Sequence, residues 1–497
     1  MTWFVRPLIR PSATFSPLRG AKGNLALAPR SGERVAEGRV RGVALLALIV
    51  LLAGCTVGPN YQRPNVTVPD HYYGAPANAT AEADWADLFR DPVLKALVDE
   101  AVNNGFDARI AAARVEQARA RYGIAGSQRY PNIGYQGVYE YGHTSTFATP
   151  SDATGGILIA NVNVGWEADL WGRIRRLNEA ARADYLATEE ARRGVLLSLV
   201  SEVAAAYFDL RELDAELEIA KHTTGALQST AELFRKRAEG GTASGLDTSR
   251  AEALLATESA LIPLIERAIV AKENQITFLL GRVPGPVQRG LALDQQPVPP
   301  SVPAGLPSAL LLRRPDIRQA EQELIAANAN IGVAQAAFYP TLSLTGLLGG
   351  QSPELASLLG SGHNWSIGAS LLGPIFNGGR LRSQRQLAVA QFDEARVAYE
   401  REITSALGEV STDLVANEKL AEAETQRSRA VESDREAVRL ATLRYDSGFS
   451  AYFEVLDAQE QLFTAETSLA QVRRDRLVAL VDLYRALGGN WTATQTP

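Results

Sequence analysis

The chain has 497 residues, an apolar share of 46% and one cysteine, Cys55. A single cysteine excludes an internal disulfide framework and a cysteine-based zinc site. The four histidines, at 71, 143, 222 and 363, are never four residues apart, so we expect no metal and no cofactor. Residues 1–54 carry eight Lys/Arg and two Asp/Glu, and their removal changes the net charge from −6 to −12. An acidic chain is a poor partner for nucleic acid.

The N-terminal region has the features of a secretory signal. Residues 43–52 form an apolar run of ten that is too short to cross a bilayer, and Arg34, Arg39 and Arg41 precede it. The first 33 residues, rich in Pro and Arg, do not fit such a signal, and translation that starts further downstream would explain them. We predict a signal region over 1–54.

The signal ends at the only cysteine of the chain. Leu52-Ala53-Gly54-Cys55 resembles a bacterial lipobox, in which the cysteine is acylated and becomes the mature N-terminus. More than one acyl chain anchors a protein stably to a membrane. We predict a covalent lipid on Cys55 and an extended polar tether over 55–90; the alternative is a chance cysteine after an ordinary signal.

An internal repeat with an offset of about 207 residues organises the rest of the chain. Arg173 corresponds to Arg380, Asp247 to Glu454, and Leu280-Gly281 to Leu487-Gly488. We predict a first repeat over 91–280, a proline-rich linker over 281–307, a second repeat over 308–488 and a tail over 489–497. Each repeat is expected to run helix, strand pair, very long helix, second long helix.

The strand pairs, expected at about 130–167 and 340–371, alternate apolar and polar residues with period two. Each strand has about ten residues, the length that a tilted membrane strand needs. A water-soluble sheet packed on a core is the alternative, but no second sheet is predicted for it to pack against. We predict that one set of side chains faces lipid, namely Leu342, Leu344, Ile367 and Ala369. The set that we expect to face water is Ser343, Thr345, Ser366 and Ser370.

Four strands cannot close a barrel, and open sheet edges are not tolerated in lipid. The chain is therefore expected to oligomerise: two copies would give eight strands, and three would give twelve with room for a pore.

Two long helices are predicted from Arg173 to Ala238 and from Arg380 to about Tyr445. Apolar residues recur in them at spacings of three and four, as in a coiled coil, and no proline interrupts the first. Each would be roughly 100 Å long. The glycines at 240–241 and 448 end them, and shorter helices return from Asp247 and Glu454. The helices alone would also suit a periplasmic coiled-coil scaffold.

Together these features resemble the TolC-like outer-membrane factors, in the lipoprotein branch that includes OprM and NodT. The resemblance rests on Gly58-Pro59-Asn60-Tyr61 after the lipobox, on the two strand-to-helix junctions at 166–173 and 373–380, and on the turn at 445–457. It covers residues 55 to 490. It implies a mixed α and membrane-β fold: a homotrimer with a twelve-stranded β-barrel and an α-helical periplasmic barrel.

The resemblance also implies a function. Such proteins are passive exit ducts in the outer membrane that extend into the periplasm. They work with a periplasmic adaptor protein and an inner-membrane pump of the resistance-nodulation-division type, and export small toxic molecules. The exit duct of a type I protein-secretion system is the alternative. The sequence contains no GxxxxGK[ST] or HExxH motif, and we predict that the protein is not an enzyme.

The resemblance assigns a gate to the turns between the long helices. Glu454 and Asp457 match acids that line the aperture, and Asp247 and Tyr445 match links that hold it shut. Ser450 stands where some members have an arginine, and Arg250 is a candidate substitute. From spacing alone, Asp247 and Glu454 could equally be acids that stabilise helix N-termini.

Overall fold

The computed structural model describes residues 56–74, 90–143, 154–242, 244–298, 307–358, 360 and 362–489. All of these belong to one unit, residues 54–497. The predicted signal region, Cys55, most of the predicted tail and parts of the predicted tether and linker lie outside the described residues. No described helix is long and apolar enough to cross a membrane.

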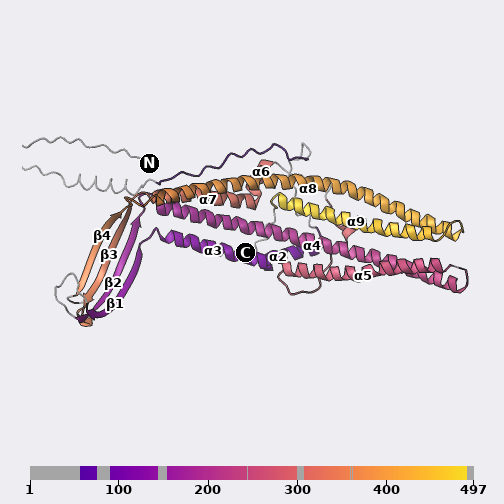
Figure 1. The fold of residues 1–497 in the computed structure, drawn as a ribbon, viewed down its shortest axis with the longest axis horizontal. Helices are drawn as coiled ribbons and strands as arrows, with labels where there is room; N and C mark the ends of the chain where they lie inside the picture. Colours follow the sequence, from indigo (N-terminus) through magenta and orange to yellow (C-terminus); the bar gives the residue numbers. More distant parts are fainter. Residues whose placement is uncertain are drawn as a thin grey trace, which may run out of the picture. The chain divides into compact units, whose positions relative to one another are not determined.

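The order of elements repeats once along the chain (Figure 1). The first series is α2 (Pro92–Asn104), α3 (Phe106–Ser127), β1 (Asn132–His143), β2 (Thr154–Ala168), α4 (Arg173–Glu239) and α5 (Gly245–Leu279). After a short 3-10 turn, η2 (Leu293–Gln295), the second series is α6 (Pro307–Arg313), α7 (Pro315–Ala336), β3 (Thr341–Ser352), η3 (Leu355–Ser357), β4 (His363–Leu372), α8 (Arg380–Asp446) and α9 (Phe453–Ala486).

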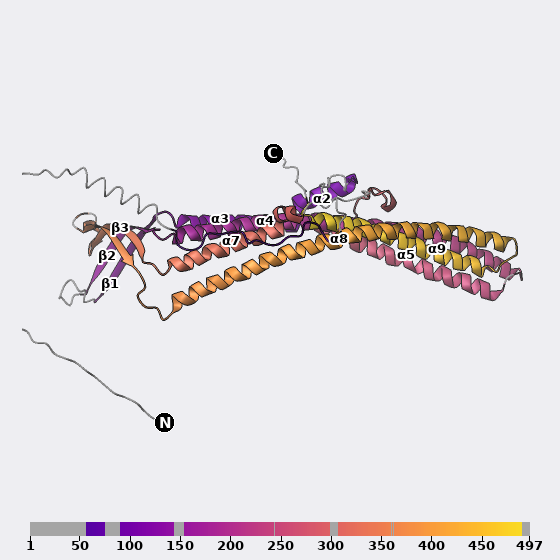
Figure 2. The ribbon, with the colours of Figure 1, turned by 90° about the horizontal axis from the view of Figure 1, so that it is seen from above.

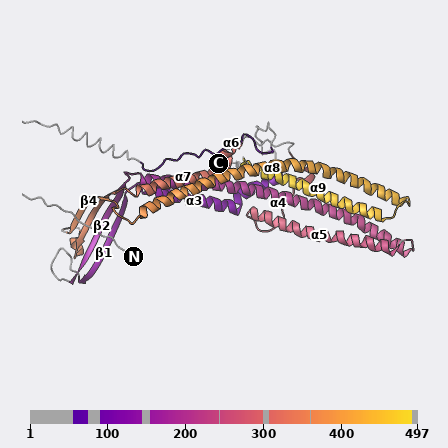
Figure 3. The same ribbon diagram turned by 45° about the horizontal axis from the view of Figure 1, so that its top comes forward.

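The two long helices begin at the arginines named from the sequence, and each has 67 residues. They extend away from the sheet, and α5 and α9 return beside them (Figures 1 and 3). Most of the apolar positions predicted in the first long helix are buried, among them Leu199, Val203, Leu210 and Leu227. The coiled-coil spacing therefore marks the face that α4 packs against its neighbours.

The four strands form one antiparallel sheet in the order β1-β2-β3-β4. The register pairs Leu344 with Ala369 and Ser343 with Ser370, so the apolar and polar sets predicted from the sequence lie on opposite faces. The apolar face continues across β2 and β1, because Trp166 pairs with Leu344 and Val162 pairs with both Leu348 and Tyr135. The alternation fails near the loop end of the first strand pair, where Val138 and Ile159 pair on the polar face.

No other part of the described chain covers the apolar face of the sheet. Tyr135 is 90% exposed, Ile367 83% and Trp365 70%. Figure 1 shows the sheet beyond one end of the labelled helices, none of which lies over its face. Contiguous exposed apolar surface of this kind marks an interaction or membrane surface, and the soluble-sheet alternative would have buried it.

The helices nearest the sheet repeat its order. In the contacts between elements, α3 packs on α4, α4 on α7 and α7 on α8. Figure 2 shows α3 and α8 along opposite margins of this row. Because each strand connects to the helix in line with it, sheet and helix row form one continuous wall with α3 and α8 at its edges.

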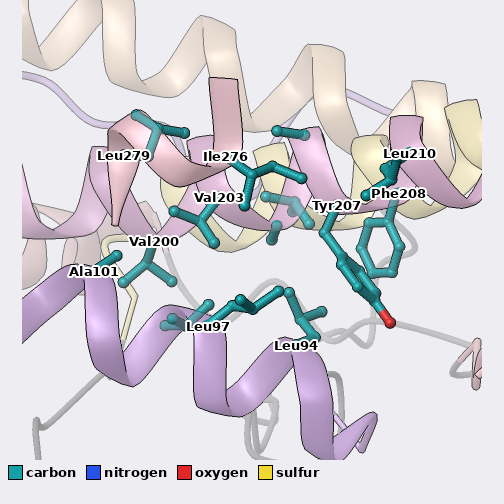
Figure 4. Packing of buried hydrophobic residues seen from close by; sticks show 14 of the residues in the cluster. Leu94, Leu97, Ala101, Val200, Val203, Tyr207, Phe208, Leu210, Ile276 and Leu279 are labelled. Atoms are coloured by element: carbon teal, nitrogen blue, oxygen red, sulfur yellow. The ribbon is translucent and has the colours of Figure 1, made fainter. Parts of the chain in front are cut away.

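The largest apolar cluster lies where α4 packs against α2, α5 and α9 (Figure 4). Leu94 and Val98 of α2 meet Val203 and Tyr207 of α4, and all four are fully buried. This cluster lies midway along α4, which extends from it toward the sheet in one direction and toward the helix tips in the other.

A fully buried carboxylate, Asp91, caps α2 beside this cluster. It accepts hydrogen bonds from the Tyr207 hydroxyl at 2.7 Å, the Gln296 amide at 2.9 Å and the backbone N–H groups of Val93 and Leu291, each at 2.9 Å. Burial alone would favour the neutral acid. The donors, chiefly Gln296 and Tyr207, outweigh burial and lower the pKa of Asp91. The carboxylate therefore joins α2, α4 and the segment between the repeats.

We predict that Asp91→Ala lowers the free energy of unfolding by about 3 kcal/mol, because it leaves buried donors without an acceptor. Since folding lowers this pKa, the ionised form stabilises the protein above the ordinary pKa of an aspartate, near 3.8. That stability is lost as the pH falls below this value through the lowered pKa. Melting temperatures in detergent across this range test the prediction. Asp107→Ala, at an exposed acid in the first turn of α3, is the control. Equal melting temperatures for both variants would contradict the prediction.

Candidate gate at the helix tips

The turns that join the long helices to their return helices have the same backbone. At each one an N–H group reaches back five residues, from Thr242 to the carbonyl of Arg237 at 2.8 Å and from Phe449 to that of Arg444 at 2.9 Å. Gly241 and Gly448 have φ of 74° and 75°, which favours glycine. The equivalent turns place equivalent side chains at the far ends of both hairpins.

Asp247 is held by the start of its own helix. Ser244 is the N-cap of α5: its hydroxyl accepts from the Asp247 N–H at 3.2 Å and donates to the Asp247 carboxylate at 2.9 Å. This is a capping arrangement, in which the acid also complements the helix dipole. Within one chain, the structure thus gives Asp247 the helix-terminal role that spacing had left open.

Glu454 and Asp457 are both exposed on the first turns of α9. Glu454 lies 3.6 Å from the Arg444 guanidinium, and Asp457 accepts a hydrogen bond from Gln461 at 2.7 Å. Neither is buried, so both carboxylates remain available to an aperture formed by further copies.

Tyr445 belongs to a cluster that joins the two hairpins. Its hydroxyl accepts a hydrogen bond from Arg237 of α4, whose guanidinium lies 5.6 Å from the centre of the tyrosine ring. The ring packs against Tyr452 with centroids 4.8 Å apart, and Tyr452 packs against Phe234 of α4 at 4.6 Å. The Tyr452 hydroxyl is 2.8 Å from that of Thr230. We call these five residues the tip cluster.

The tip cluster differs from the arrangement expected from the resemblance. Tyr445 contacts Arg237, and Asp247, the other residue expected to form a link, is bonded to Ser244 of its own helix. Arg250, the candidate substitute, lies over the ring of Phe453 at 5.3 Å, a cation–π contact between α5 and α9. Arg237, Tyr452 and Thr230 were not predicted from the sequence to be gate residues. The only signal was the concentration of aromatic residues near the turn, at 445, 449, 452 and 453.

The residue after Cys55 lies at the junction between sheet and helices. The N–H of Val57 donates to the carbonyl of Trp171 at 3.1 Å, and a Cβ on Gly172 would lie 2.8 Å from Thr56. Cys55 itself lies outside the described residues. The described chain therefore begins where the apolar sheet face ends.

We expected residues after Cys55 to form a tether. Residues 56–72 are extended, but they are bound along the helices instead of crossing free space. The buried Arg176 donates to the carbonyl of Gly58 at 3.2 Å, and Arg63 forms two hydrogen bonds of 2.6 Å with Glu321 of α7. Tyr72 is buried against α7 and α8. The segment thus spans the helix row from the sheet junction to the middle of the molecule.

A sheet with one exposed apolar face, continuous with long helices that end in acidic tips, defines the subunit of a membrane channel. Among the described residues no group of three or more His, Cys, Asp or Glu could hold a metal ion.

Comparison with known proteins identifies the family. The model of the family described as "Outer membrane efflux protein" matches residues 97–282 and 306–489. The solvent efflux pump outer membrane protein SrpC of Pseudomonas putida is 37% identical over 473 residues, which are 92% of this chain and 100% of that protein. The cation efflux system protein CusC of Escherichia coli O6:H1 is 34% identical over 457 residues, 90% of this chain and 98% of that protein.

A solved structure agrees with these relatives. The crystal structure of the Campylobacter jejuni CmeC outer membrane channel superimposes with a TM-score of 0.82 at 25% identity, and covers 89% of this chain and 96% of that one. This chain belongs to the outer membrane efflux protein family.

The family confirms several predictions from the sequence. The resemblance, the mixed α and membrane-β fold class, the location in the outer membrane with extension into the periplasm, and the role as an exit duct in efflux are correct. The family is one of efflux ducts and not an enzyme family. The relatives are named for solvent and cation efflux, which gives no support to the alternative of a type I secretion duct.

We predict that loosening the tip increases single-channel conductance in planar bilayers. Tyr445→Phe with Asp247→Ala removes the hydroxyl held by Arg237 and the carboxylate that accepts a hydrogen bond from Ser244, the N-cap of α5. Glu454→Ala with Asp457→Ala should instead remove block by trivalent cations added from the periplasmic side, because it removes two carboxylates per chain. The control for the second change is Glu418→Ala with Glu422→Ala. It removes an exposed acidic pair from α8 at a distance from the tip. If both tip variants conduct and block like the parent, the gate lies elsewhere.

Proposed function

We propose that three copies of this chain form the outer-membrane duct of a tripartite efflux system. The observation that carries the proposal is the four-stranded sheet, which has an exposed apolar face and two unpaired edges, β1 and β4. Unpaired backbone groups are not tolerated in lipid, and bacterial barrels have at least eight strands. Three copies give twelve strands and leave room for an aqueous pore.

The helices support the same closure. If β4 of one copy pairs with β1 of the next, α8 of the first lies beside α3 of the second, and the helix wall closes at the same time as the sheet. Both edge helices expose apolar side chains that this contact would cover. They are Phe106, Ile110 and Ile124 on α3, and Leu387 and Val397 on α8.

The partners follow from the family's place in efflux. A duct open to the outside performs no transport work by itself, so energy must come from elsewhere. We propose that the helix tips receive a periplasmic adaptor and, through it, an inner-membrane pump of the resistance-nodulation-division type. The cargo class that we propose is small toxic compounds such as organic solvents or drugs. Deletion of the gene should increase sensitivity to such compounds, and copurification with an adaptor should identify the pump.

We further propose that Cys55 carries the lipid anchor. Its neighbour Thr56 is held at the sheet-to-helix junction, so acyl chains on Cys55 would lie at the periplasmic surface of the membrane that the sheet crosses.

The strand faces provide a direct test of the barrel. Arginine on a lipid face costs about 2–4 kcal/mol at mid-membrane and far less in the lumen. We predict that Leu344→Arg strongly reduces the yield of heat-modifiable trimer in outer-membrane fractions. Ser343→Arg, on the opposite face and paired across from Glu167, is the matched control and should assemble normally. Equal yields would count against the assignment of faces.

The anchor is tested by labelling cells with radioactive palmitate. We predict that the parent protein is labelled and that Cys55→Ser is not, because no other cysteine can replace it. The variant should still form some trimer, since the barrel itself holds the protein in the membrane. A labelled serine variant would refute the prediction.

A further inference from the structure

The loop from β4 to α8 and the first turns of α8 carry an exposed apolar and basic surface that the channel role does not explain. Ile375 is 104% exposed and Phe376 90%. Arg380, Arg382 and Arg385 follow within ten residues and are exposed. We call these five residues the α8 basic patch.

The basic patch does not stabilise its own helix. Cations are unfavourable at a helix N-terminus, and α8 has no acidic residue in its first turn. The equivalent arginines of α4 are neutralised: Arg173 pairs with Glu167 at 2.7 Å and Arg175 with Asp169 at 3.3 Å. The sequence 373–380 lacks these acids, and among the described residues none forms an ion pair with the three arginines of the patch.

A neighbouring copy would not supply the missing negative charge. In the proposed trimer the patch faces the sheet-proximal end of the next copy's α3. That end carries Arg121 and Arg129, both exposed, while the acid Glu116 further along α3 already pairs with Arg119 at 3.0 Å. Each seam between copies would therefore gather about five arginines at the level of the sheet junction and, among the described residues, no acid left to pair with them.

An anion is needed to stabilise such a seam, and its position indicates which one. The patch adjoins the apolar sheet face, on which Leu371, paired with Leu342, is exposed just before the loop. Apolar side chains that enter the acyl region, with arginines at the level of the headgroups, are typical of surfaces that bind anionic lipid. Arginine also forms paired hydrogen bonds with phosphate.

We propose that each subunit seam binds the phosphate headgroup of an anionic phospholipid from the periplasmic leaflet, between the α8 basic patch of one copy and α3 of the next. This inference rests on the proposed trimer. The lipid would neutralise facing arginines that otherwise repel each other, and would thereby stabilise the closed ring.

The test uses full-length trimer purified in neutral detergent and titrated with phosphatidylglycerol or phosphatidylcholine. Native mass spectrometry counts the bound lipids. We expect the parent to retain phosphatidylglycerol in preference to phosphatidylcholine, and Arg380→Gln with Arg382→Gln to bind it about tenfold more weakly. Arg427→Gln with Arg429→Gln is the matched control, because it removes an exposed pair of the same spacing from the same helix, far from the sheet.

Each outcome is decisive. A parent trimer without preference for phosphatidylglycerol, or a double variant at 380 and 382 that binds like the parent, overturns the inference. Competition by inorganic phosphate as strong as that by the lipid would assign the seam to a free anion and also overturn it. If the double variant does not assemble, the parent's preference and its weakening by salt still decide the question. A parent that forms no trimer would refute the proposed function instead.

Discussion

The requirement that every backbone N–H and C=O in lipid be hydrogen-bonded governs this molecule. One chain satisfies it for the inner strands β2 and β3 and leaves it unmet along β1 and β4. The remainder of the fold is arranged around completing that pairing. The helices follow the same order as the strands. Pairing of the edge strands of neighbouring copies would therefore also bring their edge helices α8 and α3 together. A chain that closed a barrel by itself would need at least eight strands, twice the number in this sheet.

The two repeats share a backbone plan and differ where they leave the membrane. In the first, Glu167 and Asp169 bind the arginines that begin α4, Asp169 also accepts from two N–H groups of the helix, and the N-terminal segment packs against Gly172. In the second, two consecutive glycines, Gly378 and Gly379, adopt positive φ with open space around them. At the first junction, the arginines and the glycine are contacted by other residues of the same chain. At the second junction, the described residues make no equivalent contacts, so its surface is open to a partner.

Much of this fold could be predicted from the sequence because it is set by local periodicity. The alternation of polar and apolar residues predicts the opposite faces of Ser343 and Leu344. Apolar residues three and four positions apart predict the buried side of α4, and the glycines predict where the long helices end. The contacts that could not be predicted are those between residues of the first repeat and residues of the second. The contacts of Arg237 with Tyr445 and of Tyr452 with Thr230 join residues more than 200 positions apart. The binding of residues 56–72 along α7 likewise depends on Arg176 and Glu321, whose partners no periodic pattern indicates.

The equal lengths of α4 and α8 have a consequence for how such chains can change. Both helices have 67 residues and start at the same level of the sheet, so their ends meet at Arg237 and Tyr445. Removal of one residue from either would shorten it by about 1.5 Å and turn everything beyond by roughly 100°. Arg237 would then point away from its partner. Insertions and deletions in these helices are therefore tolerable only as compensated pairs, or in steps close to whole numbers of turns, and the depth of the periplasm that the duct spans can vary only in discrete increments.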